Sequence, residues 1–570
     1  MIALFYTSLF FKKSVTRRSA FNQWKVVLAT LVLAAVVFAS LAEAQTAQWV
    51  KQMGLGGISN GVSSDAAGNA YATGMVSNPG LFDNLVIPCN ASDVFLAKYD
   101  AAGNVQWANV GGGDLLDQGN KVVTDAGGNS YVVGAIQTNS LHPTAKFDNI
   151  TLTGNGDYDW LIVKYNTSGQ VVWAQNYGSA SGDIADGVAL DAAGNVYVTG
   201  FFNGTMMVQG VTVTSQGLFD IFLAKLDANG TLLWLKTAGG TGSDQAHGVV
   251  VDGQGNVGIT GEFQGTSKFD ANSIKAAGLG DAFIAKYDAA GTNLWVHGGG
   301  STTSFAGDPA KAIAVDGANN VFITGDYTGT AIFDGLSVPN TGTSGSDIFL
   351  AKYNSSGVIQ WLHHAGGPPS DKGYSIGVDT SGNSWVTGFA ASGPGVVFDT
   401  ITLPPFGNEY IFLAKYDPAG VVQYVKQYAA GTGQDIYVLS NGVLYLNGGA
   451  SKGNGKEFDD ISLVYNDRGG FICQFSEPAG GGCEPPAGVM ASNITSNTAT
   501  ISWSAVADAS SYLLQYRKVG TNRWKTKPAP RTVVRLKNLA SSTSYEYQVA
   551  TVCATETSPH SAVQIFTTNL

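Results

Sequence analysis

A motif that recurs seven times, at intervals of 60 to 66 residues, constrains this chain more than any other feature of its sequence. The motif reads Asp-x-x-Gly-Asn-x-aromatic-x-x-Gly in its clearest copies. Its first residues are Asp65, Asp125, Asp191, Asp252, Asp316, Asp379 and, in a degraded seventh copy, Leu439. Asp-x-x-Gly and Gly-Asn between apolar runs are signals of β-hairpin turns, so each copy predicts two antiparallel strands.

Two further motifs predict a third and a fourth strand in each repeat. The third is an F-L-A-K-Y run that ends at Tyr99, Tyr165, Leu226, Tyr287, Tyr353, Tyr416 and, degraded, Phe475. The fourth is G-x-x-x-W, with its aromatic residue at Trp107, Trp173, Trp234, Trp295, Trp361 and Tyr424. The missing seventh copy of this last motif lies before the first repeat, around Trp49.

This offset predicts an all-β fold in which residues 45–476 form a seven-bladed β-propeller closed by the N-terminal strand. The strand around Trp49 completes the last blade, so that no sheet edge is left open. The alternative is an open solenoid. A solenoid would need no circular offset and would want polar caps at both ends.

The repeat resembles the SBBP β-propeller repeat of secreted bacterial proteins, and its first two strands also resemble NHL-type propeller repeats. The resemblance extends from about Trp49 to Ser476 and recurs with every copy. It implies a propeller fold and an extracellular setting. It implies no single activity, so the function has to be argued from other features.

Residues 1–44 are interpreted as a signal peptide. Five basic residues precede the apolar run from Val26 to Leu41, and Ala42-Glu43-Ala44 is a small-residue cleavage site. The apolar run is short for a spanning helix, which needs ~20 residues. We expect a mature chain that begins at Gln45, has no transmembrane segment and is secreted or displayed on the cell surface. An uncleaved anchor is the alternative.

The charge of the chain excludes one class of partner. The formal net charge is −11, and only 13% of the residues are charged. Binding to nucleic acid needs a basic surface that neutralises phosphates, so we expect no nucleic-acid partner for the propeller. We expect a monomer.

A second domain follows a linker at residues 477–486, which is rich in Pro and Gly. Residues 487–570 contain short alternating strands about ten residues apart. The segment from Leu539 to Tyr545 is similar to the tyrosine-corner region of fibronectin type III domains, and Trp503 occupies the position of their buried strand-B tryptophan. The resemblance implies a fibronectin-III-like β-sandwich.

The chain has four cysteines and no C-x-x-C pair, which makes a zinc site a poor interpretation. An exported protein permits disulfides. Cys483 precedes the first strand of the second domain and Cys553 ends a late one, so a bridge between these two is the favoured pairing. Two free thiols are the alternative. The pairing of Cys89 and Cys473 is left open.

One face of the propeller is the candidate site. The first-to-second and third-to-fourth turns are tight and share one face, whereas the long second-to-third loops and the fourth-to-first loops share the other. Binding usually uses such loops on a rigid scaffold. Five carboxylates enter this face eight residues before the turn motif, at Asp117, Asp183, Asp244, Asp308 and Asp371. A second set opens the third strand, at Asp93, Asp159, Asp220, Asp281 and Asp347.

These carboxylates have two interpretations. As a partial ring around the channel mouth they would bind a cation such as Ca²⁺ or a polar ligand, because hard cations prefer carboxylate oxygens. As repeat-building residues they would instead accept hydrogen bonds from the backbone of their own loops, which is the favoured interpretation. The lysine of the F-L-A-K run, as at Lys98 and Lys225, is expected to pair with turn carboxylates and has no catalytic role.

No catalytic motif is visible: the sequence has no H-E-x-x-H, no G-x-S-x-G and no phosphate loop. We therefore expect no cofactor, and a secreted or cell-surface, non-catalytic binding or adhesion protein with an extracellular glycan or protein as ligand. The alternative is a carbohydrate-active enzyme, a hydrolase or lyase that uses paired carboxylates on the same face. A structural surface-layer role is a third hypothesis.

Overall fold

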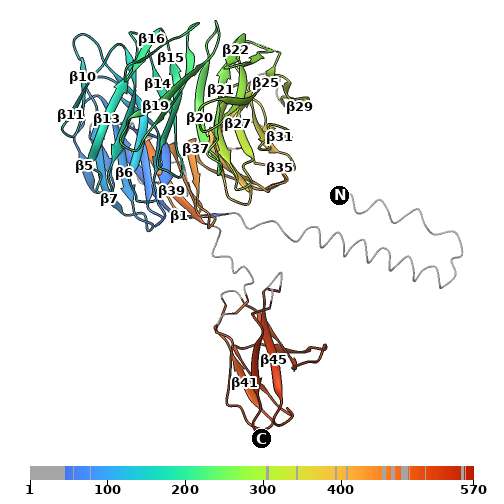
Figure 1. The fold of residues 1–570 in the computed structure, drawn as a ribbon. Coiled ribbons are helices and arrows are strands. Elements are labelled where there is room, and N and C mark those ends of the chain that lie inside the picture. The colour runs from blue at the N-terminus through green and yellow to red at the C-terminus, as the bar shows by residue number, and fades with distance from the viewer. Residues whose placement is uncertain are drawn as a thin grey trace, which may run out of the picture. The chain divides into compact units, whose positions relative to one another are not determined.

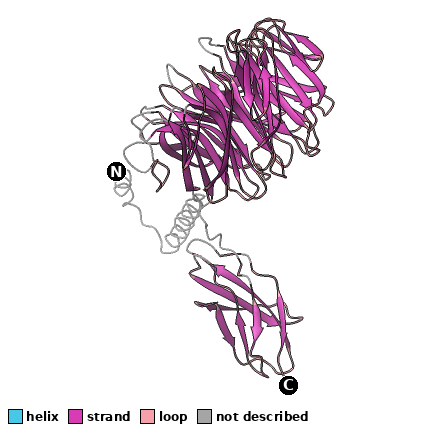
Figure 2. Ribbon diagram, turned by 90° about the vertical axis from the view of Figure 1, so that its left-hand side faces the viewer, coloured by secondary structure: helices cyan, strands magenta, loops and turns pink. Residues whose placement is uncertain are grey.

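The computed structural model describes residues 45–570 except 56, 78, 303–306, 342–344, 392–394, 406–408, 452–456, 464–468, 477–484, 487, 507–508, 554–556 and 559. The described residues form strands, turns and loops without any helix, as Figure 2 shows. Among them there is accordingly no helix that could span a membrane. Contacts within the chain divide it into two compact parts, and the division along the sequence falls between residues 477 and 478. The predicted signal peptide, residues 1–44, lies outside the described residues.

The first part contains seven four-stranded antiparallel units in its described residues (Figure 1); six have their strands in chain order, and the seventh takes its fourth strand from the N-terminus. The first strands are β2 (Ile58–Ser64), β8 (Gln118–Thr124), β14 (Ile184–Leu190), β20 (Gln245–Val251), β26 (Ala310–Val315), β32 (Asp371–Val378) and the second half of β37 (Val422–Val438). The second strands are β3 (Ala70–Ser77), β9 (Ser130–Gln137), β15 (Val196–Phe202), β21 (Val257–Phe263), β27 (Val321–Tyr327), β33 (Ser384–Ala390) and β38 (Leu444–Ser451).

The outer half of each unit follows the same order. The third strands are β6 (Ser92–Tyr99), β12 (Tyr158–Tyr165), β18 (Asp220–Leu226), β24 (Asp281–Tyr287), β30 (Asp347–Tyr353), β36 (Tyr410–Tyr416) and β39 (Gly469–Ser476). The fourth strands are β7 (Val105–Gly111), β13 (Val171–Tyr177), β19 (Leu232–Ala238), β25 (Asn293–Ser301), β31 (Ile359–Gly366), the first half of β37 and β1 (Thr46–Leu55).

The core lies between neighbouring units. Third strands such as β18 are buried along their whole length, as expected for strands covered on both faces. Trp160 of the second unit packs on Phe222 of the third, with ring centroids 5.1 Å apart, and both belong to one buried apolar cluster. Burial of this apolar area is the main force that holds the units together, at roughly 25 cal/mol per Å² removed from water.

The contacts between units return from the last unit to the first. The first strands of successive units contact one another from β2 through β32 to β37, and β37 also contacts β2. The N-terminal strand β1 pairs with β39, from Thr46 opposite Ser476 to Leu55 opposite Gly469, which is where the motif offset placed it. The two strands lie next to each other in Figure 1.

Trp49 fills the same position between the last and first units that the other tryptophans fill between consecutive units. A side chain at Gly103, where φ is +81°, would place its Cβ 2.6 Å from Trp49 Cδ2, so only glycine fits there. Gly169 meets Trp107 in the same way at the next junction. The Trp49 indole also donates a hydrogen bond to the Ala101 carbonyl at 3.1 Å. At both junctions the tryptophan therefore packs against the glycine turn of the neighbouring unit.

The second-to-third connections are not free loops over their whole length, because six of them contain a described hairpin. These are β4 (Gly80–Phe82) with β5 (Leu85–Ile87), β10 (Thr144–Phe147) with β11 (Ile150–Thr153), β16 (Thr205–Val208) with β17 (Val211–Thr214), β22 (Thr266–Phe269) with β23 (Asn272–Lys275), β28 (Ala331–Phe333) with β29 (Leu336–Val338), and β34 (Val397–Phe398) with β35 (Ile401–Thr402). Several pair with the fourth strand of the preceding unit, and β4 pairs in this way with β1.

The second part is a sandwich of two antiparallel sheets. One sheet contains β40 (Met490–Ser492), β41 (Ala499–Ser502) and β44 (Val533–Leu536). The other contains β43 (Lys525–Ala529), β42 (Ser511–Lys518), β45 (Ser544–Val552) and β46 (Gln564–Thr567). Trp503 is buried between them against Tyr512, and the Tyr545 hydroxyl accepts a hydrogen bond from the Ala540 N–H at 2.9 Å, as a tyrosine corner does.

Candidate functional site

The repeated turn motif forms a hydrogen-bonded network around its aspartate in six of the seven units. The Asp65 carboxylate accepts hydrogen bonds from the Asn69 backbone and side-chain N–H groups and from the Tyr71 hydroxyl, and Lys98 Nζ lies 3.7 Å from it. Burial opposes ionisation here, but the Asn69 and Tyr71 hydrogen bonds and the Lys98 charge hold the pKa of Asp65 below its usual value. The prediction that this lysine pairs with turn carboxylates is confirmed.

The five carboxylates of the first predicted set are all buried, with at most 1% of each residue exposed. In Asp117, one carboxylate oxygen accepts the Gly113 N–H and the other accepts the Gln137 N–H at 2.8 Å. Asp371 repeats this arrangement with the Gly367 and Ala391 N–H groups. The remaining three carboxylates accept hydrogen bonds from the corresponding pair of backbone N–H groups; they are Asp183, Asp244 and Asp308. Each carboxylate therefore joins the fourth-to-first loop of its unit to the end of the second strand.

The second predicted set lies beside the first. The position that a Cβ would take at Gly112 is 2.4 Å from Asp93 Oδ1 and 2.6 Å from Asp117 Oδ2, so the carboxylate of the first unit's third strand and the carboxylate that enters the second unit are neighbours across a glycine. The same holds at Gly178 for Asp159 and Asp183. Burial and the like charge of the neighbour raise the pKa of these groups: to about 7 for Asp117 and Asp371, and to about 6 for Asp183, Asp220 and Asp308.

These carboxylates therefore hold their own loops in place by accepting hydrogen bonds from backbone N–H groups. Among the described residues, no three His, Cys, Asp or Glu side chains are grouped so that they could hold a metal ion. Ca²⁺ binding by the five aspartates therefore stays a sequence prediction.

The cysteine prediction is tested only in part. Cys89 and Cys473 are free and buried. The proposed partner of Cys553, Cys483, lies outside the described residues. Since the chain has four cysteines, Cys483 and Cys553 are the two left for a bridge.

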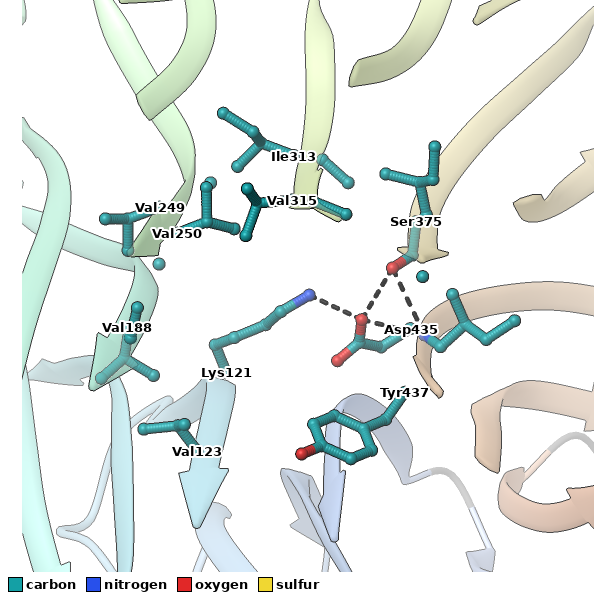
Figure 3. A pocket seen from close by; sticks show the side chains of 18 of the residues that line it. Lys121, Val123, Val188, Val249, Val250, Ile313, Val315, Ser375, Asp435 and Tyr437 are labelled. Carbon is teal, nitrogen blue, oxygen red and sulfur yellow. Dashed lines mark hydrogen bonds and ion pairs between the residues drawn. The ribbon is translucent and has the colours of Figure 1, made fainter. Parts of the chain in front are cut away.

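A cavity of about 410 Å³ lies between the first strands of all seven units. Its wall is largely apolar, from side chains such as Val188, Val249 and Ile313 (Figure 3). We call this cavity the channel. It is within the size range of small-ligand sites, ~300–1,000 Å³.

One ion pair reaches across the channel wall. Lys121 Nζ lies 2.6 Å from Asp435 Oδ1, and these residues come from the second and seventh units, on either side of the first. Asp435 also accepts hydrogen bonds from the Ser375 hydroxyl at 2.7 Å and from the Val62 N–H at 2.9 Å. Figure 3 shows Lys121 and Ser375 converging on this carboxylate. The pair compensates the charge of the buried Asp435 carboxylate in the channel wall.

A second cavity of about 320 Å³ adjoins Lys121 and His247, which also line the channel, and we call it the mouth. Its lining includes one residue from the first strand of every unit: Asn60, Asn120, Asp186, His247, Lys311, Tyr374 and Gln434. The sequence interpretation missed these residues. The available signal was their common place five residues before each turn motif, where the residue type changes from repeat to repeat.

Hydrogen bonds fix several of the mouth side chains to the next unit. The Asn60 side-chain amide donates to the Gly119 carbonyl at 3.0 Å, and the Asn120 amide donates to the Ala185 carbonyl at 3.1 Å and to Asp186 at 2.9 Å. His247 Nδ1 lies 3.1 Å from the other Asp186 oxygen. The mouth is thus an ordered polar surface.

Two curated relatives are similar to this chain. An uncharacterized WD repeat-containing protein of Acanthamoeba polyphaga mimivirus is 25% identical over 279 residues, which cover 41% of this chain and 20% of that protein. The regulatory protein FlaEY of Caulobacter vibrioides is 24% identical over 420 residues, which cover 68% of this chain and 42% of that protein. The chain thus spans less than half the length of either relative.

The family model of the fibronectin type III domain matches residues 484–566. The C-terminal part is therefore a fibronectin type III domain. Similar solved structures include a myokine, 20% identical with a TM-score of 0.15, covering 15% of this chain and 98% of that one. The fibronectin type III domain of human contactin 1 is 21% identical with a TM-score of 0.15, covering 15% of this chain and 77% of that one. The domain assignment rests on the family match and the strand order, not on these low scores.

Proposed function

We propose that the seven units form a closed seven-bladed β-propeller of the SBBP type. The contact between β2 and β37, the pairing of β1 with β39 and the position of Trp49 against Gly103 all support closure. The WD repeat in the name of the mimivirus relative supports it as well, because WD repeats build propellers.

On this scaffold we propose a secreted or cell-surface binding protein without catalytic activity, whose ligand enters the mouth of the channel. The observation that carries this proposal is the mouth itself: a cavity of about 320 Å³ lined by one polar side chain from the first strand of each unit. The fibronectin type III domain would serve as a spacer or docking module. The signal peptide and the Cys483–Cys553 bridge belong to the same extracellular proposal.

The buried aspartates give little support to a carbohydrate-active enzyme. A general acid or nucleophile has to reach the substrate, and Asp117 and Asp371 are enclosed with their oxygens bonded to backbone N–H groups. The enzyme hypothesis is therefore an outcome of the test below.

The test combines binding and turnover on one sample. The full chain is applied to arrays of extracellular glycans and proteins, and the same polysaccharides are incubated with it and analysed for released products. We expect binding without product. Product release would overturn the non-catalytic assignment, and the absence of any bound glycan or protein would overturn the binding function.

A further inference from the structure

The seven mouth residues share one backbone feature, a β-bulge. In every first strand the pairing with the second strand skips one residue: between Ser59 and Gly61 in the first unit, for example, and between Ala246 and Gly248 in the fourth. The skipped residues are Asn60, Asn120, Asp186, His247, Lys311, Tyr374 and Gln434. A bulge re-aims a side chain and is common at functional sites. Here the skipped residue lines the mouth in all seven units.

The chemistry at the bulge differs from that of its neighbours. Two residues further on, each first strand carries a branched aliphatic residue: Val62, Val122, Val188, Val249, Ile313, Ile376 and Ile436. The seven bulge residues instead comprise six residue types, all polar. Packing keeps the position two residues further on to Val or Ile in every unit, whereas the residue type at the bulge varies, as a recognition surface requires.

The mouth offers hydrogen-bonding atoms held in place. The amide N–H groups of Asn60 and Asn120 are bonded to the next unit, which turns their carbonyl oxygens away from that partner and leaves them without a hydrogen bond among the described residues. His247 Nε2 is buried and has no hydrogen-bond partner there. Lys311 makes no salt bridge or hydrogen bond within the described part of the chain. An unsatisfied buried polar atom destabilises the unliganded protein, and a bound hydroxyl would supply the missing hydrogen bond.

The charges at the mouth are nearly balanced. Lys121 pairs with Asp435, His247 contacts Asp186, and Lys372 Nζ lies 3.6 Å from Asp326. Lys311 forms no salt bridge with a described carboxylate, but its charge acts on Asp326 together with that of Lys372 and opposes the burial that raises the pKa of this carboxyl. This balance disfavours multiply charged ligands such as phosphate esters and suits a neutral ligand or one with a single carboxylate.

An aromatic pair flanks these polar groups. Tyr374 contacts Phe389 with ring centroids 5.8 Å apart. Planar amides and an imidazole bond adjacent hydroxyls, since each hydroxyl both donates and accepts, and an aromatic ring packs on the C–H face of a pyranose. A cavity of about 320 Å³ has room for a sugar ring.

We propose that the mouth binds one saccharide residue, a neutral hexose or a hexuronic acid, through the bulge side chains, with Lys311 as the contact for a carboxylate. This inference rests on the proposed binding function and adds its ligand class.

The experiment uses the full chain and defined probes. The methyl glycosides of glucose, galactose, mannose and N-acetylglucosamine, together with glucuronic and galacturonic acids, are titrated by calorimetry and by saturation-transfer NMR. We expect binding of at least one probe. Loss of one hydrogen bond is worth about 1.4 kcal/mol, so Asn120→Ala should weaken it about tenfold. Lys311→Ala should remove any preference for the uronic acid.

The control is Asn229→Ala, which removes an exposed amide of the same size from a third-to-fourth turn, outside the lining of the mouth. Thermal unfolding of each variant checks the fold, and Lys311→Ala, which removes no described hydrogen bond, remains informative if Asn120→Ala unfolds.

Each outcome decides between the two proposals. Saccharide binding that is weakened by the mouth variants and unchanged in the control supports the inference. Saccharide binding that is equally strong in all variants overturns the site and leaves the binding function standing. Binding of an array protein, lost in the mouth variants without any saccharide binding, overturns the ligand class alone. Binding of neither class overturns both proposals.

Discussion

The turn side of the repeat region, which holds the Asp-x-x-Gly-Asn turns, and the mouth are built from the same strands. The residue types that recur from unit to unit at the turns do not recur at the mouth. At the turns, Asp65, Asn69, Tyr71 and Lys98 recur as Asp191, Asn195, Tyr197 and Lys225 with the same hydrogen bonds. At the mouth, the equivalent positions hold six different residue types.

The difference separates what builds the fold from what is available for function. Every unit must close a similar turn and pack on the next unit, so these positions keep the same residue in most units, with exceptions such as Leu439 in the seventh copy. The bulge residue is released from the alternating register of its strand and does not have to fill the core. Substitutions should therefore be costly for stability on the turn side and nearly neutral at the mouth.

The largest expected effect is at the junction of the last and first units. Trp49→Ala removes a 9% exposed indole from the junction of the last and first units and should cost about 3–5 kcal/mol, because the cavity against Gly103 cannot collapse. Chemical denaturation measures it, with Val86→Ala, at a 59% exposed position, as the control. An unchanged denaturation midpoint for Trp49→Ala would show that packing at this junction does not contribute to stability.

The next effect is a pH dependence with opposite signs on the two sides. Burial raises the folded-state pKa of Asp117 and of Asp371 to about 7, so between pH 4 and 7 the folded state binds more protons than the unfolded state. Their contribution to stability is full below about pH 4 and is lost as the pH rises to about 7. Each carboxylate contributes on the order of 1–4 kcal/mol.

The turn aspartates act in the other direction, because the folded-state pKa of Asp65 is lowered and its contribution is lost as the pH falls through that pKa. Unfolding free energies between about pH 2 and pH 8 measure both effects: the turn aspartates act below about pH 4 and the buried aspartates above it. In Asp117→Asn the loss of stability between pH 4 and 7 should become smaller. If the unfolding free energy changed with pH in this variant as it does in the unmodified chain, the raised pKa of Asp117 would be contradicted.

A smaller effect is expected at the channel ion pair. Lys121→Met leaves the buried Asp435 with its hydrogen bonds from Ser375 and Val62 but without a cation, at a cost of about 1–2 kcal/mol because Lys121 is 32% exposed. Lys51→Met is the matched control, since its pair with Asp83 is 3.2 Å long and 26% exposed on both sides, and should cost about 0–1 kcal/mol. Equal costs would mean that burial adds nothing to the channel pair.

The smallest effect is predicted at the mouth. Lys311→Ala should change the unfolding free energy by less than about 0.5 kcal/mol, because the side chain makes no salt bridge or hydrogen bond with a described residue. Thermal unfolding beside Trp49→Ala measures it. A cost near that of Trp49→Ala would remove the distinction between the two sides.

Particular elements show how far the sequence could be interpreted. The strand around Trp49 was placed beside the last repeat from a missing motif copy, and β1 pairs with β39 accordingly. The Phe-Asp pairs at Phe82, Phe147, Phe269 and Phe333 also recur, but they lie in what looked like variable loops. The structure shows these phenylalanines buried in hairpins that fold against the unit before.

The carboxylates show how far the sequence could predict the candidate site. Five aspartates, each eight residues before a turn motif, suggested both a ring of ligands and a set of residues that cap their own loops. This position in the sequence alone does not distinguish the two roles. Asp117 and Asp371 are buried and bonded to backbone N–H groups, a property of the loop that surrounds them.

By itself the sequence determined the number of repeats, the strands of each, the position of the N-terminal strand and the C-terminal domain. These follow from residue types at fixed intervals, because each turn and each packed indole needs one chemistry wherever it recurs. Only the tertiary structure decided which side chains line the mouth. A bulge exists only between two paired strands of unequal residue count, so its re-aimed residue cannot be identified from one strand's alternation alone.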